Sequence, residues 1–356
     1  MPQPIPPALE QARSEIDAAL ASAWDRLLPP VTDIDARLEP VTAALRRFTH
    51  GGKRVRPALL LLGFEAAGGA DRTAVHGPAL ALELLHTCAL VHDDVIDRAP
   101  TRRGRPTVHR AFAAAHAEAG WSGDADDYGE AVAILVGDLA FVQADALFLE
   151  AAVPADALMA GLRCFVTLRE EVMAGQFLDL QTATSRSSDR SAAMAVATLK
   201  SGRYSVSRPL EVGAALAGAG APLREALRAA ADPLGRAFQL RDDLLGVFGQ
   251  EDDTGKSTAS DLAEGKRTLL ITEALRRLDP DGRDVLEAAL GDPQLSDDEA
   301  DRLRGLLEDC GARAAVERTV AEEVAASHAA IADLPVADAA RTRLHELARY
   351  LGDRRA

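Results

Sequence analysis

The chain has 356 residues, of which 47% are apolar and only 4% are aromatic. Its net charge of −15 predicts a surface that repels nucleic acid and anionic lipid, so neither is expected as a partner. The three cysteines, Cys88, Cys164 and Cys310, stand far apart, which excludes a CxxC metal or redox motif and suits a reducing compartment.

The first half of the chain predicts a series of helices, because Ala and Leu are common and strand-forming residues are scarce. Residues 1–7 are rich in proline and lack the features of a signal peptide, so we expect a disordered tail. Apolar spacing and proline or glycine breaks then predict helices over residues 8–28, 34–48, 56–67 and 76–98. Pro106 predicts the first turn of another helix, which ends near Glu118. A polar loop is expected over residues 119–129.

The second half of the chain also predicts a series of helices. A nearly continuous apolar stretch, residues 131–152, predicts a buried helix. Further long helices are expected over residues 155–182, 189–217 and 223–247, the last with a break or kink at Asp232–Pro233, and shorter amphipathic helices over 266–352. No strand alternation, nucleotide-binding glycine motif or tandem repeat appears. No long apolar stretch is free of charges, so we expect a cytoplasmic all-α protein with one domain over 8–356 and no stable membrane insertion.

An acidic motif closes the predicted helix 76–98. Asp93, Asp94 and Asp97 stand at positions i, i+1 and i+4, so a helix places them within a wedge of about 100°. Three negative charges at a helix C-terminus repel one another and oppose the helix dipole. A bound cation offsets that cost, and hard oxygen ligands suit Mg²⁺. The motif therefore predicts a magnesium site.

Two further groups point in the same direction. His86 falls on the same stripe two turns earlier; by itself it would be a hydrogen-bonded core histidine, but the carboxylates above it favour a functional role. A second carboxylate pair, Asp242 and Asp243, follows Gln239 by one turn, and Gly246 stands where a further acidic ligand would complete the group. This pair is either a solvated face or the opposite side of a cavity that holds divalent ions.

Basic residues gather near glycines and near both acidic groups. They are Lys53, Arg54 and Arg56 after Gly51–Gly52, Arg102 and Arg103 before Gly104, and Lys200, Lys256 and Lys266 farther along. Any one of them alone would be a solvated charge. In an acidic chain, such clusters beside Asp groups indicate bound phosphate with Mg²⁺ as a bridge.

The ordered motifs resemble those of trans-isoprenyl diphosphate synthases. The sequence as a whole is similar to those of bacterial geranylgeranyl diphosphate synthases. The motifs are GGKRVRP, HDDVID with RRGRPT, Gly175-Gln176-x-x-Asp179-Leu180, Lys200-Ser201, Gln239-x-x-Asp242-Asp243 and GKRT at 265–268. They span roughly residues 45–275, and their order is highly specific. The resemblance implies a bundle of long helices around a central cavity, small isoprenyl diphosphates as partners, and a homodimer, for which residues 131–152 are a candidate interface.

The resemblance also implies roles for individual residues. Magnesium ions, several in each site, would bind to Asp93, Asp94, Asp97, Asp242 and Asp243. Isopentenyl diphosphate would bind to Lys53, Arg56, His86 and Arg103. The allylic diphosphate would bind to Arg102, Lys200, Ser201, Gln239, Lys256 and Lys266. Asp93, Asp97, Lys200 and Asp242 would be the catalytic set. Ser201 replaces the usual Thr, and Gly246 replaces a third Asp.

The implied reaction ionises an allylic C–O bond, adds a homoallylic double bond to the cation and then loses a proton. Metal ions and cationic side chains would stabilise the leaving diphosphate, which is itself the expected base. Product length would depend on the residues one turn before Asp93, which are Cys88 and Ala89. Because both are small, we expect geranylgeranyl diphosphate as the main product, with farnesyl diphosphate or longer chains as alternatives.

Two other functions are alternatives to a prenyl diphosphate synthase. A class I terpene cyclase also uses an Asp-rich helix, but it would carry an Asn/Ser/Glu metal triplet in place of Asp242–Asp243, and more aromatic residues. A regulatory subunit of a heteromeric synthase would show eroded Asp motifs, whereas the first motif here is intact.

Overall fold

The computed structural model describes residues 5–249, 260–292 and 294–352. Nearly all of these residues are helical, and the strands among them are the short antiparallel pair β1 (Thr101–Arg102) and β2 (Arg105–Pro106). The prediction of an all-α protein is confirmed. Contacts divide the chain into two compact units: an N-terminal unit of residues 7–61 and 70–158, and a C-terminal unit that contains residues 62–69 and the chain from 159 onward.

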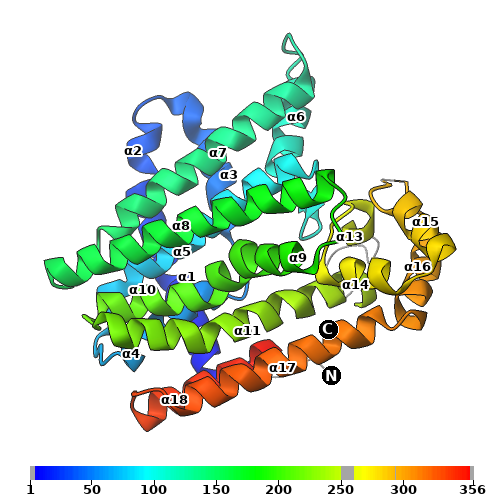
Figure 1. Ribbon diagram of the computed structural model, residues 1–356. Helices are drawn as coiled ribbons and strands as arrows, with labels where there is room; N and C mark the ends of the chain where they lie inside the picture. The colour runs from blue at the N-terminus through cyan, green and yellow to red at the C-terminus, as the bar shows by residue number, and fades with distance from the viewer. Residues whose placement is uncertain (1–4, 250–259, 293, 353–356) are drawn as a thin grey trace. The chain divides into compact units, whose positions relative to one another are not determined.

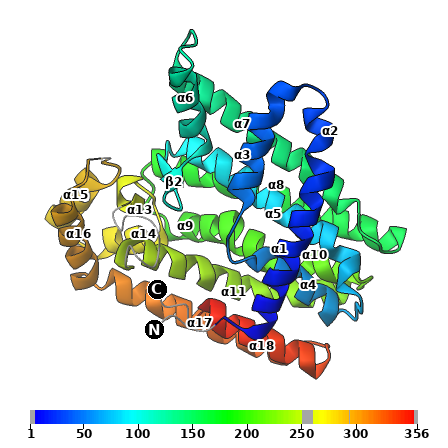
Figure 2. The same cartoon turned by 180° about the vertical axis from the view of Figure 1, so that it is seen from behind.

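The N-terminal unit is organised around α5 (His76–Ile96), in which every residue from Pro78 to Leu85 is buried. It packs against α7 (Ala125–Phe148), on which α6 (Val108–Glu118) also packs, while α1 (Pro7–Leu27) and α3 (Glu39–Thr49) contact other parts of α5 (Figure 2). The remaining elements are α2 (Pro29–Thr32), η1 (Ala36–Leu38), the first half of α4 (Val55–Ala66) and η2 (Arg72–Val75). A helix that is apolar on all sides is buried on all sides. The helix α5 is of this kind, so the Asp residues at its C-terminal end lie next to the packed core.

The C-terminal unit is organised around α11 (Ala221–Phe248). In Figure 1, α17 (Ala312–Ala332) and α18 (Asp338–Gly352) lie along one side of α11, and the π-helix η3 (Ala197–Ser207) and α10 (Arg208–Leu216) pack on it from another. The helix α8 (Ala155–Thr184) belongs to this unit from residue 159 onward, and α9 (Arg190–Val196) runs directly into η3. The other helices are α13 (Ser260–Ala263), α14 (Leu269–Arg277), α15 (Pro280–Ala289) and α16 (Asp297–Asp309).

Several local predictions need correction. Pro106 does not begin a helix: it pairs with Thr101 in the hairpin, and α6 begins at Val108. The predicted loop over 119–129 is too long, because α7 begins at Ala125, where the Asp124 carboxylate accepts hydrogen bonds from the N–H groups of the next turn. An Asp at the N-cap stabilises such a start.

The predicted buried helix over 131–152 is wrong for one face of α7. Ile134, Leu135 and Val142, together with Leu149 just beyond the helix, are between 46% and 61% exposed. By length and composition, residues 72–96 and 125–148 are each apolar enough to cross a membrane, although core helices of soluble proteins pass the same test. The exposed apolar face of α7 is therefore available for contact with another apolar surface.

The expected break at Asp232–Pro233 does not occur, since α11 is helical from Ala221 to Phe248 with Pro233 inside it. Proline cannot donate a hydrogen bond to the preceding turn and disturbs the carbonyls there. The fully buried Ser327 of α17 donates its hydroxyl to the Ala230 carbonyl at 2.8 Å. The N–H that Pro233 lacks would bond the Ala229 carbonyl, so this tertiary contact binds the carbonyl next to the orphaned one.

Candidate active site

The first acidic motif lies at the C-terminal end of α5. Asp93 and Asp97 are half-buried and one turn apart on the same stripe, and the N–H of Asp97, the C-cap residue, donates to the Asp93 carbonyl at 2.8 Å. Asp94 lies about 100° around the helix and is only 1% exposed. The predicted trio of carboxylates therefore separates into a pair on one stripe and a third, buried carboxylate.

Asp94 is held by Arg102. The hairpin β1–β2 turns through Arg103 and Gly104, both at positive φ, and brings the Arg102 guanidinium to Asp94 with Nε–Oδ1 and Nη2–Oδ1 distances of 2.7 and 2.6 Å. Burial and the neighbouring Asp93 raise the pKa of Asp94 above its usual range even though Arg102 opposes this. The Asp94 Oδ2 atom is buried and has no hydrogen-bond partner.

The charges of all three carboxylates in the motif act on the pKa of Arg102. Burial alone would lower the pKa of Arg102, but the hydrogen bond with Asp94 and the charges of Asp93, Asp94 and Asp97 outweigh it and raise that pKa. The guanidinium is therefore positive beside the Asp93–Asp97 stripe. A positive group and two carboxylates side by side suit a complex of metal ions with an anion.

A basic cluster surrounds His86 on the same helix. The pKa of His86 lies well below its usual range, first because the ring is desolvated and then because of the positive charges of Arg56, Arg103, Arg102 and Arg54. These side chains come from two segments distant in the sequence, residues 54–56 and 102–103, and both lie near enough to His86 for their charges to act on its ring. Two of these guanidinium groups already pair with carboxylates, Arg102 with Asp94 and Arg54 with Asp17 and Glu83. Arginine side chains such as Arg56 and Arg103 suit the oxygens of a phosphate anion.

Glycine makes room for this cluster. Gly51 and Gly52 have φ values of +81° and +98°, and a Cβ on Gly52 would lie 3.4 Å from Nη2 of Arg103. Arg103 also donates from Nη1 to the His50 carbonyl at 3.1 Å. Lys53 is exposed on the same loop. The loop thus brings its own cations and Arg103 together.

Arg54, which the sequence grouped with the cations expected to bind phosphate, has a structural role instead. Its side chain is 2% exposed and forms ion pairs with Asp17 of α1 at 2.9 Å and with Glu83 of α5 at 2.5 Å. Glu83 lies one turn before His86 on α5. A signal did exist in the sequence, because a Glu in the middle of a fully apolar helix needs a buried partner.

In the C-terminal unit, Lys200 and Ser201 lie within the π-helix η3. The Lys200 ammonium contacts Asp179 Oδ2 of α8 at 2.6 Å, and both side chains are 21% exposed. A Cβ on Gly175 of α8 would lie 2.3 Å from the Lys200 backbone nitrogen. The motif Gly175-Gln176-x-x-Asp179 therefore provides both the close approach and the acidic partner for Lys200.

The second acidic pair lies near the C-terminal end of α11. Gln239 donates from Nε2 to Asp243 Oδ1 at 2.6 Å, while Asp242 is exposed. Lys266, beyond α13, forms an ion pair with Glu264. Lys256 falls outside the residues that the structure describes. Gln239, Asp242 and Asp243 thus lie in the last three turns of α11, and Gln239 contacts Asp243 directly.

The two residues predicted to control product length differ in their surroundings. Cys88 is 7% exposed, its Sγ lies 3.8 Å from Nδ1 of His92, and burial together with the charge of Asp138 raises the pKa of its thiol to about 12. Nε2 of His92 donates to the Ile134 carbonyl of α7 at 3.1 Å. Ala89 instead lies on the stripe of Asp93 and Asp97. Cys88 therefore faces the α5–α7 contact, and Ala89 lies directly below the acidic pair.

The donor set suits magnesium that is shared with a phosphate ligand. Among the described residues, no three His, Cys, Asp or Glu side chains lie close enough together to enclose a metal ion by themselves. Mg²⁺ is commonly bound by only one or two carboxylates and completed by phosphate oxygens and water. The Asp93–Asp97 pair, with cations nearby to bind the phosphate, fits that pattern.

Known proteins share this sequence and structure. A family model described as polyprenyl synthetase matches residues 39–307. The (2E,6E)-farnesyl diphosphate synthase of Mycobacterium bovis is 33% identical over 98% of this chain and 93% of its own, and the geranylfarnesyl diphosphate synthase of Aeropyrum pernix is 30% identical over 86% and 91%.

Among solved structures, the geranylgeranyl pyrophosphate synthase of Corynebacterium glutamicum, complexed with isoprenyl diphosphate and magnesium, is 35% identical with a TM-score of 0.93 and covers 98% of this chain and 99% of its own. The named products of these relatives differ in length, but all are isoprenyl diphosphates. The chain therefore belongs to the polyprenyl synthetase family and is a trans-prenyltransferase.

Proposed function

We propose that the protein condenses isopentenyl diphosphate with an allylic diphosphate and that geranylgeranyl diphosphate is its main product. The observation that carries this proposal is that Arg56 and Arg103 lie near enough to His86 for their charges to act on its ring, two turns below the Asp93–Asp97 pair on one helix. A diphosphate is an anion that matches the charge of these basic side chains. The homologous structure from Corynebacterium glutamicum, with isoprenyl diphosphate and magnesium, supports this choice.

The proposed isopentenyl diphosphate site consists of Lys53, Arg56, His86 and Arg103. Arg56 and Arg103 would bind the phosphate oxygens through paired N–H groups, which suit that geometry better than a single ammonium. His86, neutral in the free protein, would donate a hydrogen bond to the diphosphate, whose negative charge favours protonation of the ring. Arg54 would hold the loop in place and make no contact with the ligand.

The proposed allylic site uses both acidic groups. Asp93 and Asp97 on α5, and Asp242 with Asp243 on α11, would bind Mg²⁺ on the allylic diphosphate, and bound Mg²⁺ would stabilise the charge of the leaving group. Arg102, Lys200, Ser201, Gln239, Lys256 and Lys266 would hold the same diphosphate. Asp94 is proposed to act chiefly by fixing Arg102, because the structure pairs these two side chains.

The chemical step then needs charge stabilisation and dry walls. Cationic side chains around the leaving diphosphate favour ionisation, because they stabilise charge that develops in the transition state. The apolar side chains of the helices keep water from the carbocation. The departing diphosphate is the proposed base for the final proton loss. A single side-chain variant that blocked only proton loss would contradict this assignment.

Incubation of the purified protein with Mg²⁺, isopentenyl diphosphate and each of the dimethylallyl, geranyl and farnesyl diphosphates tests the proposal. Chromatographic sizing should show a twenty-carbon diphosphate as the main product. A main product of fifteen carbons, or of more than twenty, would support the alternative chain lengths. Cyclised hydrocarbon would identify a terpene cyclase, and no turnover with any primer would favour a regulatory subunit.

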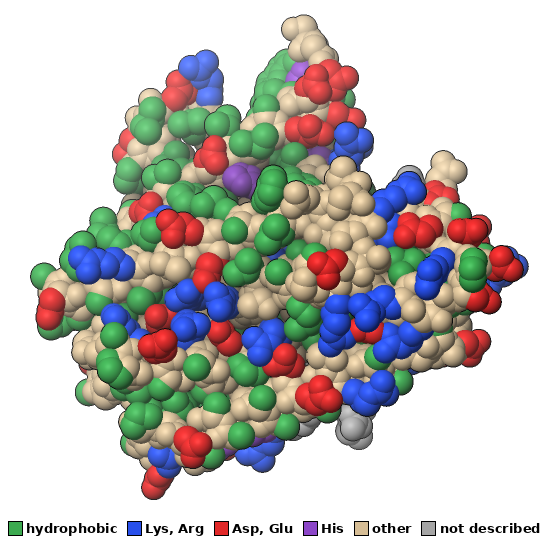
Figure 3. Space-filling model, viewed as in Figure 1, with side chains coloured by type: hydrophobic (Ala, Val, Ile, Leu, Met, Phe, Trp, Pro, Cys, Tyr) green, Lys and Arg blue, Asp and Glu red, His purple; other side chains and the backbone are tan. Residues whose placement is uncertain are grey.

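We further propose a homodimer, formed through exposed apolar helix faces. On α8, exposures between 38% and 64% occur at Met159, Val166, Met173, Phe177 and Leu180, which recur at helical spacing. Figure 3 shows hydrophobic side chains among charged ones on the face of the molecule that carries α8. We also propose that the two units form one catalytic domain, since the family match spans both, and that the protein is cytoplasmic without membrane insertion.

A further inference from the structure

Lys200 is presented by an unusual backbone. The helix η3 keeps the π form for 11 residues, from Ala197 to Ser207. π-helical segments are usually single turns and are frequent at functional sites. So long a segment needs support from its neighbours, and α8 and α11 provide it at several levels.

One stripe of α8 contacts η3 at three successive turns. Glu171, Gly175 and Asp179 stand at positions i, i+4 and i+8 and therefore face the same way. Asp179 contacts the Lys200 ammonium, and Gly175 allows the Lys200 backbone to approach α8 directly. Glu171 accepts a hydrogen bond from Nη1 of Arg203 at 2.8 Å.

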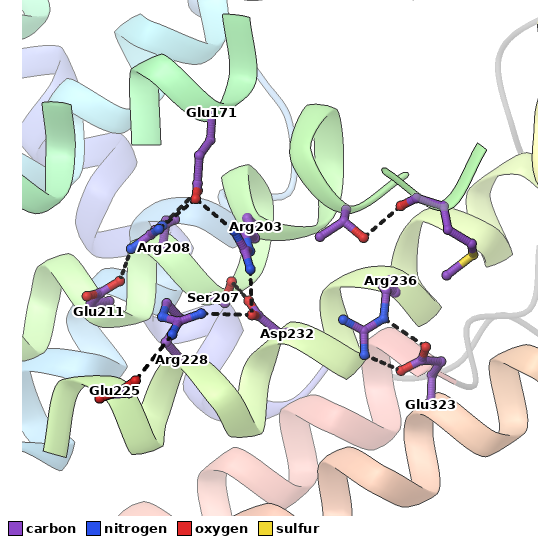
Figure 4. A network of polar contacts seen from close by, with 12 residues as sticks. Glu171, Arg203, Ser207, Arg208, Glu211, Glu225, Arg228, Asp232, Arg236 and Glu323 are labelled. Atoms are coloured by element: carbon purple, nitrogen blue, oxygen red, sulfur yellow. Dashed lines mark hydrogen bonds and ion pairs between the residues drawn. The ribbon is translucent and has the colours of Figure 1, made fainter. Parts of the chain in front are cut away.

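The helix α11 supports η3 in the same manner. Gly235 meets Gly202, so closely that a Cβ on Gly202 would lie 2.8 Å from the Gly235 carbonyl carbon. One turn earlier, Asp232 accepts hydrogen bonds from Nη2 of Arg203 at 3.4 Å and from the Ser207 hydroxyl at 2.5 Å. Arg203 therefore joins η3 to both helices at once, as Figure 4 shows.

The charges in this network complement one another. Arg208, the first residue of α10, contacts both Glu171 oxygens at 2.7 and 2.6 Å, and the Glu171 side chain is only 15% exposed. Burial by itself would raise the pKa of Glu171, but the hydrogen bonds and charges of Arg208 and Arg203 outweigh it and lower that pKa. The carboxylate is therefore ionised at neutral pH, and the loss of one partner would leave a half-buried charge poorly compensated.

We propose that Arg203, Glu171 and Asp232 are positioning residues that hold η3 in its π form and thereby place Lys200 and Ser201 for the allylic diphosphate. This inference rests on the function proposed above for Lys200. In this proposal Arg203, Glu171 and Asp232 do not contact the substrate. They affect the position of Lys200 and Ser201 through the backbone of η3.

The test compares Arg203→Met with a matched control, Arg236→Met. Arg236 lies on α11, and it forms a similarly short, partly buried ion pair with Glu323 of α17, with both N–O distances at 2.7 Å (Figure 4). Its loss removes a comparable interaction without touching η3. Amide hydrogen exchange of residues 197–207 and steady-state kinetics for each substrate are measured for both variants.

For Arg203→Met we expect faster exchange in η3 and a fall of about tenfold in kcat/KM for the allylic primer, with the KM for isopentenyl diphosphate changed less than about twofold. Arg203→Lys, which keeps the charge, should recover part of the loss. In a Lys200→Ala background, Arg203→Met should add little further loss. Arg236→Met should match Arg203→Met in thermal stability but keep normal exchange in η3 and normal primer kinetics.

Two results overturn different parts of the inference. If η3 exchanges no faster in Arg203→Met than in Arg236→Met, the proposed support of η3 is wrong. If Lys200→Ala leaves the primer kinetics unchanged while Arg203→Met still speeds exchange, the support stands and the role of Lys200 is wrong. Asp232→Asn, which keeps an acceptor for Ser207, replaces Arg203→Met if that variant does not fold.

Discussion

The guanidinium of Arg54 and the carboxylate of Glu83 form a buried ion pair, with Nη1 2.5 Å from Oε2 and both side chains at most 6% exposed. Arg54 has a φ of +52°, so the chain turns sharply as its side chain enters the core. The next turn of α5 carries His86, and the residues that flank Arg54 include Lys53 and Arg56. The ion pair therefore fixes the position of the basic loop relative to His86.

Replacement of Glu83 by Gln should destabilise the protein by about 3 kcal/mol, because it leaves the Arg54 charge buried without its main partner. The KM for isopentenyl diphosphate should rise, since the loop loses its anchor. Urea unfolding and steady-state kinetics measure the two effects. Arg343→Gln is the control: it breaks the more exposed ion pair with Glu65 and should cost no more than about 1 kcal/mol. Equal costs for both variants would contradict the proposed anchor.

Isopentenyl diphosphate should bind together with a proton near neutral pH. The lowered pKa of His86 keeps the free ring neutral, and the negative diphosphate offsets the surrounding arginines and raises that pKa in the complex. A group whose pKa rises on binding takes up a proton, so affinity should increase as pH falls toward about 6.5. The free protein should lose stability over the same fall in pH, because only the unfolded chain gains the proton.

Titration calorimetry in buffers of different ionisation enthalpy measures the proton uptake directly. His86→Gln should abolish the part of the uptake that belongs to this ring, which separates it from titration of the diphosphate itself. Equal uptake in the parent protein and in His86→Gln would count against a neutral histidine in this site.

Gly137→Ala should disturb the contact between α5 and α7. A Cβ at this position would lie 2.2 Å from Nε2 of His92, the residue just before Asp93. The ring would have to leave its hydrogen bond with the Ile134 carbonyl, at a cost of about 1–3 kcal/mol. Gly305→Ala in α16 is the control, because it meets no atom within 4 Å and should be stabilising by up to about 1 kcal/mol. Thermal unfolding of both variants decides whether the His92 contact is tight.

Ala89→Phe should shorten the product to fifteen carbons or fewer while the protein stays folded. Ala89 lies on the Asp93 stripe, along which the growing chain is proposed to extend, and each helical turn spans about 5.4 Å. Cys88→Phe should instead destabilise the protein by about 1–3 kcal/mol, because Cys88 is buried against His92. Product sizing and thermal melting distinguish the two. An unchanged product from Ala89→Phe would remove Ala89 from chain-length control.

Phe177→Glu on α8 should convert the proposed dimer to a monomer. Phe177 is 64% exposed in the isolated chain, the largest exposed fraction in the apolar stripe of α8. Val285→Glu on α15, where Val285 is 56% exposed, is a matched control that should leave the oligomer intact. Light scattering after size exclusion reads the mass of each variant. A monomeric parent protein would refute the dimer outright.

The placement of the candidate site residues on α5 could be predicted from the sequence because it depends on spacing along one helix. Asp93 and Asp97, and His86 below them, follow from the period of the α-helix, and the all-α class follows from composition. Arg102 and Arg103 were identified by their type and their neighbouring glycine. These properties are local, so they survive without knowledge of the fold.

What the sequence by itself determined is therefore the helical class, the spacing of the two acidic groups along their helices and the family. Only the tertiary structure decided that Asp94 pairs with Arg102, that Arg54 is buried against Glu83, that Pro233 lies inside an unbroken helix and that Lys200 lies in a π-helix between two others. Each of these depends on partners distant in the chain. A buried charge or an unusual backbone is stable only when those partners compensate it, and spacing along one segment does not identify them.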